Sequence, residues 1–534
     1  MSRLDDIERL IDERMREIDR KIEGKVGGNG AAQRSYKSES PGYGDRRAAV
    51  SSLSIAPFNP DFVDGAQGSK RASGFGGGLV PQPFDFSYMS SLPSMRGAAR
   101  SYPPKFDLRD RIEMMPVRDQ GSFGTCWAHA ALASMETSIL VQGRRCEDFS
   151  ENNLANLSGF DNSFGAGGNG NMAAAYLLRW DGPVLERDDP YGRPGASRSL
   201  PAVVHLQSFS FVQPMRDAAD ISGFKAALTT MGAVWVGYLH DGSGSVYRAD
   251  TGAFCLHGEP SAESGWHAVV VVGWDDSYPA SNFAVPPPGD GAWIVRNSWG
   301  TEFGKDGYFY VSYHDKTFGR AMPGYVFSGV EHSDNYDDVL QYDRLGLVTR
   351  CGTGEHGKAA NVFVAPRDMA VEAVGFYALT PNASYRIAVH VDCAADDPET
   401  GVASQETLGT SQSAGFVTVK LSAPVSVAAG RRFSVVVDVT TPGCEKPIGV
   451  ECAFPRMGTS KAEAAPGQSF INVGGRDWVD LMQIEPTANF CCKAYVSYCA
   501  DGSRSWKRFC SKCGTYTYTE TSTGGKCRKC GAWL

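Results

Sequence analysis

The segment from Pro116 to Glu136 constrains the chain most, because it joins a glycine-containing loop to a run of strong helix formers with one cysteine at the junction. Gly121 and Gly124 provide backbone freedom that is typical of a loop rather than of a regular element. From Trp127 onward Ala, Leu, Met and Glu favour a helix. Cys126 is therefore expected in the first helical turn, where exposed N–H groups and the helix dipole favour a thiolate.

Three polar residues elsewhere fit a reactive cysteine. Gln120, on the loop before Cys126, could donate its side-chain amide to an oxyanion formed when the thiolate attacks a carbonyl group. His267 stands at the start of an apolar run, residues 269–272, that predicts a buried strand. Asn297 follows a second apolar stretch, 293–295. A histidine can take the thiol proton, and an asparagine can hold the imidazole in the required tautomer.

The order Cys, His, Asn resembles the papain family of cysteine proteases. The residues that carry the resemblance are Gln120, Gly124-Thr125-Cys126-Trp127, His267 and Asn297-Ser298-Trp299-Gly300, followed by Gly304 and Gly307-Tyr308. The spacing from Cys126 to His267 falls inside the window of about 130 to 150 residues, and the spacing to Asn297 exceeds it. Residues 277–291, which contain three consecutive prolines, predict a surface insertion that accounts for the excess.

The resemblance implies a two-lobed α+β fold over residues 101–335, with a helical lobe and a β-barrel lobe. It also implies that Trp299 shields the contact between His267 and Asn297. For the substrate, it implies that Gly170 pairs with the peptide backbone and that Met172 lines the main specificity pocket. The opposite walls of this roomy apolar pocket are implied to be Gly237 and Gly265.

One departure from the family concerns a disulfide. The family usually has a cysteine three positions before the nucleophile, where this chain has Phe123, and the segment 149–157 that resembles the family's partner region contains no cysteine. We expect Phe123 to fill the space by packing.

Two segments precede the peptidase region. Residues 1–26 predict one amphipathic helix, whose apolar stripe suits self-association or docking on the protease body equally well. Residues 27–100 are rich in Gly, Ser, Ala and Pro, which predicts a linker with little structure of its own. Within this linker the apolar, proline-stiffened stretch 79–86 suits binding in a groove. It occupies the place of a papain-family propeptide, so we expect it to lower activity while attached.

Residues 340–498 predict an all-β sandwich, because short alternating strands are separated by turn residues. This region resembles the lectin-like domain that follows the catalytic domain in some bacterial papain-like proteases. A glycan partner, a protein partner and a purely structural role all remain open.

The last region, 504–534, contains two C-x-x-C-G knuckles, formed by Cys510, Cys513, Cys527 and Cys530. Four soft ligands at this spacing predict a zinc ribbon, with a structural metal that is not used in catalysis. Two disulfides are the alternative. The odd number of cysteines between Cys351 and Cys499 makes a complete disulfide framework there doubtful, so mostly buried thiols in a reducing compartment are expected.

Charge and hydropathy limit the partners. The net charge of −8 makes nucleic acid an unfavourable partner for the whole chain, and no apolar run is long enough to span a membrane. The charged N-terminus lacks the apolar core of a signal peptide, which favours the cytoplasm, with secretion or cell-surface export by another route as the alternative. The predicted function is a cysteine endopeptidase. The alternatives are a catalytically weak papain-fold protein that binds peptides or glycans, and an acyl transferase that uses the same residues.

Overall fold

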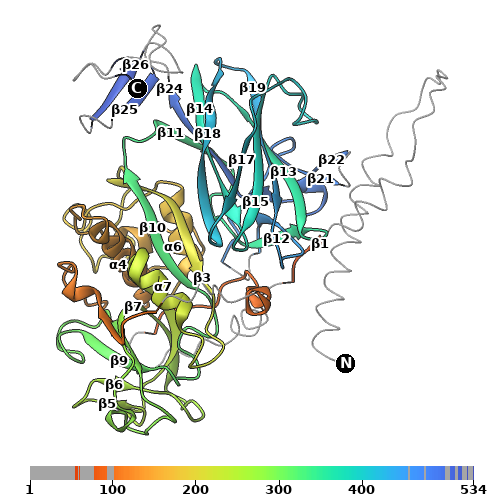
Figure 1. Cartoon of the computed structure of the whole chain (residues 1–534). Helices are drawn as coiled ribbons and strands as arrows, with labels where there is room; N and C mark the ends of the chain where they lie inside the picture. The colour runs from red at the N-terminus through yellow and green to blue at the C-terminus, as the bar shows by residue number, and fades with distance from the viewer. Residues whose placement is uncertain are drawn as a thin grey trace, which may run out of the picture. The chain divides into compact units, whose positions relative to one another are not determined.

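The computed structural model describes residues 54–57, 59, 77–92, 101–454, 458–473, 477–498, 506–510, 515–519, 526 and 533. The predicted N-terminal helix lies outside these residues. Two domains follow each other along the described chain, a mixed α/β domain and a β-rich one (Figure 1). No described helix is both long and apolar enough to cross a membrane.

The first lobe of the mixed domain is built around α4 (Cys126–Val141), as the residue pattern predicts. Its side chains are buried all round from Cys126 to Ile139, which marks a central core helix rather than an amphipathic surface helix. The short helices α5 (Glu151–Asn156) and α6 (Gly170–Leu178) pack against it. Each begins at a polar N-cap, Ser150 and Asn169, whose side chain accepts a backbone N–H three residues later.

The second lobe is an antiparallel sheet in which β10, β4, β7, β8 and β9 are successive neighbours. The connection between β7 and β8 contains the proline-rich stretch and the short helix η3 (Ala280–Asn282), so the predicted surface insertion is confirmed. Helix α7 (Ser222–Thr230) packs on this sheet. The strands are β4 (Val234–Asp241), β7 (Ser264–Asp275), β8 (Ala292–Arg296), β9 (Tyr308–Ser312) and β10 (Gly324–His332).

This sheet continues into the β-rich domain. Strand β3 (Val204–Val212) pairs with β10 on one side and with β18 (Gly415–Val427) on the other, through Ser210 with Gly415 and Phe209 with Phe416. The order then runs through β14 (Met369–Ala378), β24 (Cys492–Tyr498) and β11 (Asp338–Gln341). The sequence predicted two separate domains, and the structure joins them by backbone hydrogen bonds.

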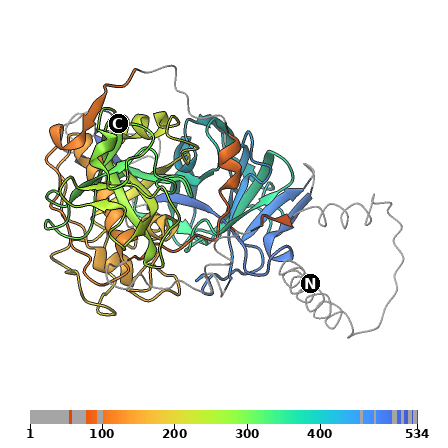
Figure 2. The ribbon, with the colours of Figure 1, turned by 90° about the horizontal axis from the view of Figure 1, so that it is seen from below.

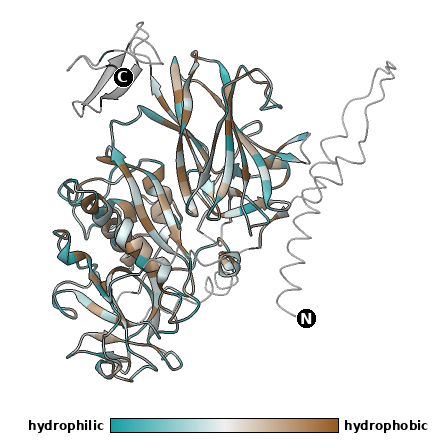
Figure 3. Ribbon diagram, viewed as in Figure 1, coloured by the Kyte–Doolittle hydropathy of each residue, from teal (hydrophilic) through white to brown (hydrophobic). Residues whose placement is uncertain are grey.

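A second sheet completes the predicted sandwich. Its alternating apolar residues face those of the first sheet and form one core, and brown and pale residues alternate along these strands in Figure 3. Its main strands are β13 (His356–Val364), β15 (Ala383–Val391), β19 (Arg432–Thr440) and β21 (Ser469–Val473), with short edge strands β16 (Val402–Ala403), β17 (Thr407–Ser411) and β22 (Asp477–Asp480).

Part of the predicted linker is packed against both domains. We call residues 77–92 the strap. Phe86 packs edge-on against Phe211 of the mixed domain, and the Tyr88 hydroxyl donates to the Leu379 carbonyl of the β-rich domain at 2.8 Å. The apolar side chains of the strap that are buried are Phe84, Phe86, Met89 and Leu92. The short helix η1 (Ser87–Ser91) of the strap lies beside the sandwich in Figures 1 and 2. Composition alone missed these contacts.

Further upstream, β1 (Ser54–Ile55) adds to a small sheet with β12 (Thr349–Gly352), β20 (Ile448–Glu451) and β23 (Asn489–Phe490). In the tail, β25 (Trp506–Cys510) and β26 (Thr515–Thr519) form a hairpin that ends at the first predicted knuckle. Cys513, Cys527 and Cys530 lie outside the described residues. The described cysteine side chains are free thiols, most of them buried.

Candidate active site

Cys126 is the first residue of α4, and its side chain is completely buried. The backbone N–H of Ala268, on β7, lies 3.4 Å from its sulfur and donates to it. The helix N-terminus adds its partial positive charge at the same position. These groups favour a thiolate wherever water or a charged partner can also reach the sulfur.

His267 and Asn297 meet beside the cysteine, as predicted. His267 lies on β7 and Asn297 directly follows the paired strand β8, so their side chains share one face of the sheet. The imidazole Nε2 is 2.8 Å from Asn297 Oδ1. An amide oxygen only accepts, so Nε2 carries the proton and Nδ1 is the basic nitrogen. Nδ1 is buried and makes no hydrogen bond to any described residue.

Trp299 covers this contact. Its indole stacks on the His267 ring with 4.5 Å between ring centroids and 23° between planes. A stacked indole keeps water away from the hydrogen bond between Nε2 and Oδ1, which strengthens it because the local dielectric is low. The position of Trp299 agrees with the shielding role that the resemblance implied.

Gln120 is buried and held by Ser298, a residue for which the sequence predicted no role of its own. The Ser298 hydroxyl donates to Gln120 Oε1 at 2.7 Å, and Gln120 Nε2 donates to the Phe123 carbonyl at 2.8 Å. Because the amide group is planar, the hydrogen bond that holds Gln120 Oε1 also fixes the direction of Nε2. Nε2 is the donor that an oxyanion needs. The position of Ser298 next to Asn297 was the signal that could have identified it.

We expect Ser298→Ala to lower kcat about three- to tenfold with little change in KM, because one orienting hydrogen bond contributes about 1 kcal/mol. The measurement is steady-state peptide hydrolysis, with Ser281→Ala, at an exposed position of the short helix η3, as the matched control. An unchanged kcat would exclude a positioning role for Ser298.

The strap runs over Cys126. The Gly168 N–H donates to the Gly78 carbonyl at 2.9 Å, and the Val80 N–H donates to the Gly168 carbonyl at 3.0 Å. On the other side the Leu79 N–H donates to the Trp266 carbonyl at 3.2 Å. A Cβ on Gly78 would lie 2.3 to 2.4 Å from the backbone of Gly124. Only glycine therefore lets the strap approach the nucleophile loop this closely.

Two of the predicted pocket residues, Gly237 and Gly265, lie at the strap. Gly237 faces the strap, since a Cβ there would lie 2.6 Å from the Leu79 side chain and 2.8 Å from the sulfur of Met322. Gly265 lies at the strap as well, next to Gly77. Leu79 thus sits against the predicted glycine wall, and Met322 is a wall residue that the sequence did not reveal.

Gly170 and Met172 do not fit their predicted places. Gly170 is the first residue of α6 and packs against the Tyr325 ring, and Met172 is buried in the same helix. The residue that pairs with the strap is Gly168, two positions earlier. The prediction placed the pairing residue inside a helix, where its carbonyl group is aligned with the helix axis and cannot face an extended chain.

The covered site is electrically neutral. Burial raises the pKa of the Cys126 thiol to about 12, although N–H groups of Ala268 and Gly78 oppose this shift. Burial also lowers the pKa of His267 to about 3, against the raising effect of Asn297. With the strap in place, the thiol and the imidazole are both uncharged at neutral pH.

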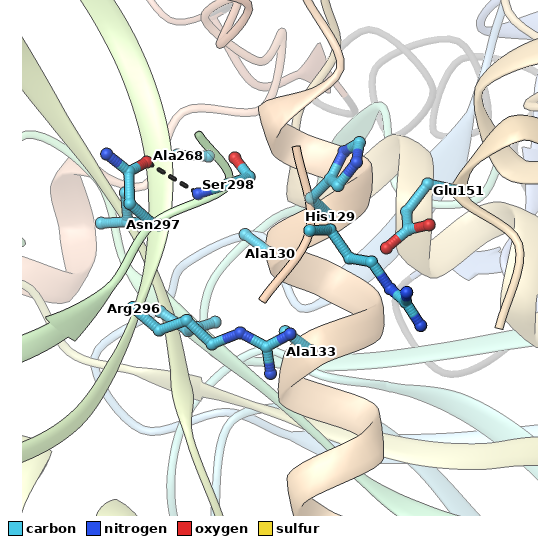
Figure 4. A pocket seen from close by; sticks show the side chains of 11 residues that line it. His129, Ala130, Ala133, Glu151, Ala268, Arg296, Asn297 and Ser298 are labelled. Atoms are coloured by element: carbon cyan, nitrogen blue, oxygen red, sulfur yellow. Dashed lines mark hydrogen bonds between the residues drawn. The ribbon is translucent and has the colours of Figure 1, made fainter. Parts of the chain in front are cut away.

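A small polar cavity lies behind Asn297, with a volume of about 10 Å³ (Figure 4). Arg296 from β8, His129 from α4 and Glu151 from α5 line it. Burial raises the pKa of Glu151 to about 7 and lowers the pKa of His129 to about 4. Arg296 also donates to the Pro116 carbonyl at 2.6 Å, which ties β8 to the loop that carries Gln120. A charged residue at the end of a buried strand was the sequence signal for this cluster.

The missing disulfide is replaced as predicted. The Phe123 ring packs edge-on against Phe164, with centroids 5.0 Å apart, and against Tyr191 at 6.4 Å. Phe123 thus ties the nucleophile loop to the neighbouring chain by aromatic packing.

Comparison with known proteins agrees with this geometry. Residues 102–325 match the papain family of cysteine proteases, and residues 339–496 match the lectin-like domain family. A cysteine protease of Blomia tropicalis is 29% identical over 246 residues, which cover 44% of this chain and 68% of that protein. Human (Homo sapiens) cathepsin O is 27% identical over 273 residues, which cover 46% of this chain and 74% of that protein.

Among solved structures, the cysteine protease and lectin-like domains of Cwp84, a surface layer associated protein of Clostridium difficile, superpose with a TM-score of 0.71 at 23% identity. The match covers 84% of this chain and 98% of that one, and it shows the shared fold. The protease and lectin-like domains recognised from the sequence motifs are confirmed, and the zinc ribbon stays a prediction. Residues 102–325 form a protease domain of the papain family of cysteine proteases, and a lectin-like domain follows at residues 339–496.

Proposed function

We propose that this protease hydrolyses peptide bonds with Cys126 as nucleophile, His267 as base and acid, Asn297 as the residue that orients His267, and Gln120 as oxyanion donor. The observation that carries the proposal is the hydrogen bond between His267 Nε2 and Asn297 Oδ1, which leaves Nδ1 as the basic atom in a buried site at the start of the cysteine's helix.

The proposed reaction has two stages. His267 Nδ1 takes the thiol proton, and the sulfur attacks the carbonyl carbon of the scissile bond, so that the carbonyl oxygen becomes negative and accepts from Gln120 Nε2. The carbon–nitrogen bond then breaks, the leaving amine takes the proton from Nδ1, and a thioester to Cys126 remains. Water attacks this acyl-enzyme after giving a proton to Nδ1, and the thiolate leaves and is protonated again.

The substrate proposal follows from the strap. Leu79 lies against Gly237 and Met322, while Gly168 pairs with the backbone on either side of it. We infer that a substrate places a leucine-sized apolar side chain in the same pocket, since glycine in the wall leaves room for it.

An epoxide that alkylates active-site thiols tests the assignment of the nucleophile. In the protein freed of residues 1–100 we expect one adduct, on Cys126, detected by peptide mass spectrometry together with loss of peptide hydrolysis. The buried Cys255, whose thiol pKa burial raises to about 12, is the internal control. A protein that binds peptides without reacting would remain unlabelled, which would favour the non-catalytic alternative.

We further propose a site of action outside the cell or at its surface. The lectin-like region favours a glycan or protein partner there, and the similar structure belongs to a surface-layer protein. The cytoplasmic prediction from the N-terminal residues receives no support from the comparisons. The mass and N-terminus of the protein recovered from its source would decide the matter.

For the tail we propose a structural zinc ion bound by Cys510, Cys513, Cys527 and Cys530. In support, the two knuckles have the spacing of a ribbon, β25 ends at Cys510, and a bridge between Lys526 and Trp533 brackets the second knuckle. We expect about one zinc per chain by metal analysis under reducing conditions, lost in Cys527→Ser with peptide hydrolysis intact, and Cys146→Ser keeping the metal. Absence of zinc from the unaltered chain would refute the site.

A further inference from the structure

A second cavity, of about 320 Å³, lies where the two domains join and contains none of the residues assigned to catalysis. It is formed by the C-terminal end of α4, by β3 and β10 of the protease domain, and by β18 of the lectin-like domain. Its lining residues are Gln142, Gln207, Ser208, Ser328, Gly329, Val330, Glu331, Tyr336, Thr418 and Lys420. This volume is within the range of about 300 to 1,000 Å³ that small-ligand sites occupy.

The backbone is irregular at this cavity. The pairing of β3 with β10 is regular from Gly324 to Val326 and again from Val330 to His332, but shifts twice in between. At the first shift two residues of β10, Phe327 and Ser328, stand against the single residue Phe209 of β3, and at the second shift Gln207 of β3 has no counterpart on β10. Two opposite bulges cancel in register, and they re-aim side chains that a regular ladder would place differently. Ser328 from the first bulge and Gln207 from the second line the cavity.

Gln207 is the lining residue that most clearly indicates a ligand. Its side chain is only 3% exposed, and neither its amide oxygen nor its amide nitrogen has a hydrogen-bond partner among the described residues. Burying an amide in this way costs free energy unless something else pairs with it. The Gln207 backbone is fixed independently, because its carbonyl accepts from the Thr418 hydroxyl at 2.5 Å. The side chain therefore lies buried in the cavity wall, with a donor and an acceptor that pair with no described residue.

The polar groups of the other lining residues indicate the chemical class of the ligand. Ser208 and Ser328 carry hydroxyls that can donate and accept, the Thr418 hydroxyl can still accept, and Gln142 carries a second amide. One cation, Lys420, and one anion, Glu331, make the lining neutral overall. Tyr336 adds an aromatic ring to the wall. Neutral groups that both donate and accept, beside an aromatic ring, suit a polyhydroxylated and uncharged molecule.

We propose that this cavity binds a neutral carbohydrate, with Gln207 as the central contact. The assignment is independent of peptide hydrolysis, since the cavity and the Cys126 site share no residue. The protease domain supplies most of the proposed site, and the lectin-like domain completes it with Thr418 and Lys420.

The test measures binding of a panel of neutral sugars (glucose, galactose, mannose, N-acetylglucosamine and their disaccharides) to the full chain by saturation-transfer NMR and calorimetry. We expect millimolar or tighter binding of at least one sugar. Gln207→Leu should weaken it at least about tenfold, because a hydrogen-bonded amide is lost from a buried contact. Gln412→Leu, the same change at an exposed position of the lectin-like domain, should bind normally.

Stability separates this proposal from a structural role. Gln207→Leu removes an amide without partners, so the melting temperature should stay the same or rise. If this variant does not fold, Lys420→Ala and Gln142→Ala carry the test, since both side chains are exposed at the cavity rim. They should lose affinity and keep peptide hydrolysis. No binding of any panel sugar, binding unaffected by these changes, or binding of free amino acids in place of sugars would each overturn the proposal.

Discussion

Replacing Cys126 by alanine is expected to reduce peptide hydrolysis by at least about 10⁴-fold, because removal of the nucleophile from a catalytic triad leaves only the residual contribution of binding and oxyanion stabilisation. The change removes one sulfur atom from a fully buried position at the start of α4. Alanine is a good helix former, so the fold should persist. The measurement is hydrolysis of a fluorogenic peptide by the protein freed of residues 1–100.

Cys146→Ala is the matched control, because Cys146 is a half-buried thiol of the same domain that lies outside the site. It should retain full activity, and both variants should show similar far-UV circular dichroism. Equal hydrolysis by Cys126→Ala and the unaltered protein would refute the assignment of the nucleophile. A loss in both variants would point to stability instead.

Removal of residues 1–100 is expected to raise peptide hydrolysis about 100-fold. A tethered segment at an effective concentration of about 1 mM with an intrinsic Kd of about 10 μM leaves the site open about 1% of the time. The strap has a high effective concentration because it is covalently attached. It has affinity for the cleft because it makes hydrogen bonds to Gly168 and Trp266 on the two sides of Cys126. The comparison is between the full chain and a chain that begins at Ser101.

Gly78→Ala in the full chain separates occupancy of the cleft from other effects of truncation. Its methyl group would lie 2.3 to 2.4 Å from backbone atoms of Gly124, well inside van der Waals contact, so the strap cannot occupy the cleft. We expect most of the activation without any truncation. Gly258→Ala, where an added Cβ meets nothing within 4 Å, is the control. Two results together would contradict inhibition by the strap. The full chain with Gly78→Ala would hydrolyse peptide no faster than the unaltered chain, and the truncated protein would be folded but also no faster.

The same comparison has a pH signature. Under the strap the Cys126 pKa is raised to about 12, so alkylation by iodoacetamide should be slow at neutral pH and rise only in strong alkali. Releasing the strap admits water, which lowers the pKa of the thiol and raises that of His267 from about 3. The truncated protein should therefore react rapidly at pH 6 to 7, a range in which the full chain does not.

The sequence could single out the three proposed catalytic residues because each lies in a short local pattern: Cys126 at a helix start, His267 in the first half of strand β7, and Asn297 directly after strand β8. It predicted Gly170 wrongly because the start of α6 depends on the Asn169 cap, which shifts the pairing glycine to Gly168. The strap was missed as structure because its burial rests on partners far away in sequence, such as Phe86 on Phe211. Composition reports nothing about such contacts.

The cavity at the domain junction was beyond prediction for a related reason. A bulge depends on how two strands pair, and the bulge residues Gln207 and Ser328 have no distinguishing pattern around them in the sequence. The role of Ser298 is an intermediate case: its position beside Asn297 was visible, but its hydrogen bond to Gln120 required the folded loop.

The hydrogen-bonded pairing of β3 with β18 makes the protease sheet continuous with one sheet of the sandwich. A cleaving domain on a loose tether samples many directions, whereas this one keeps a set direction relative to whatever the sandwich holds. If the substrate is fixed in a layer, this geometry would decide which peptide bonds the active site can reach. The side-chain preference of the pocket would then act only on those bonds. In such a protein, lengthening a loop at the seam would alter the pattern of fragments while leaving the cleavage of small free peptides the same.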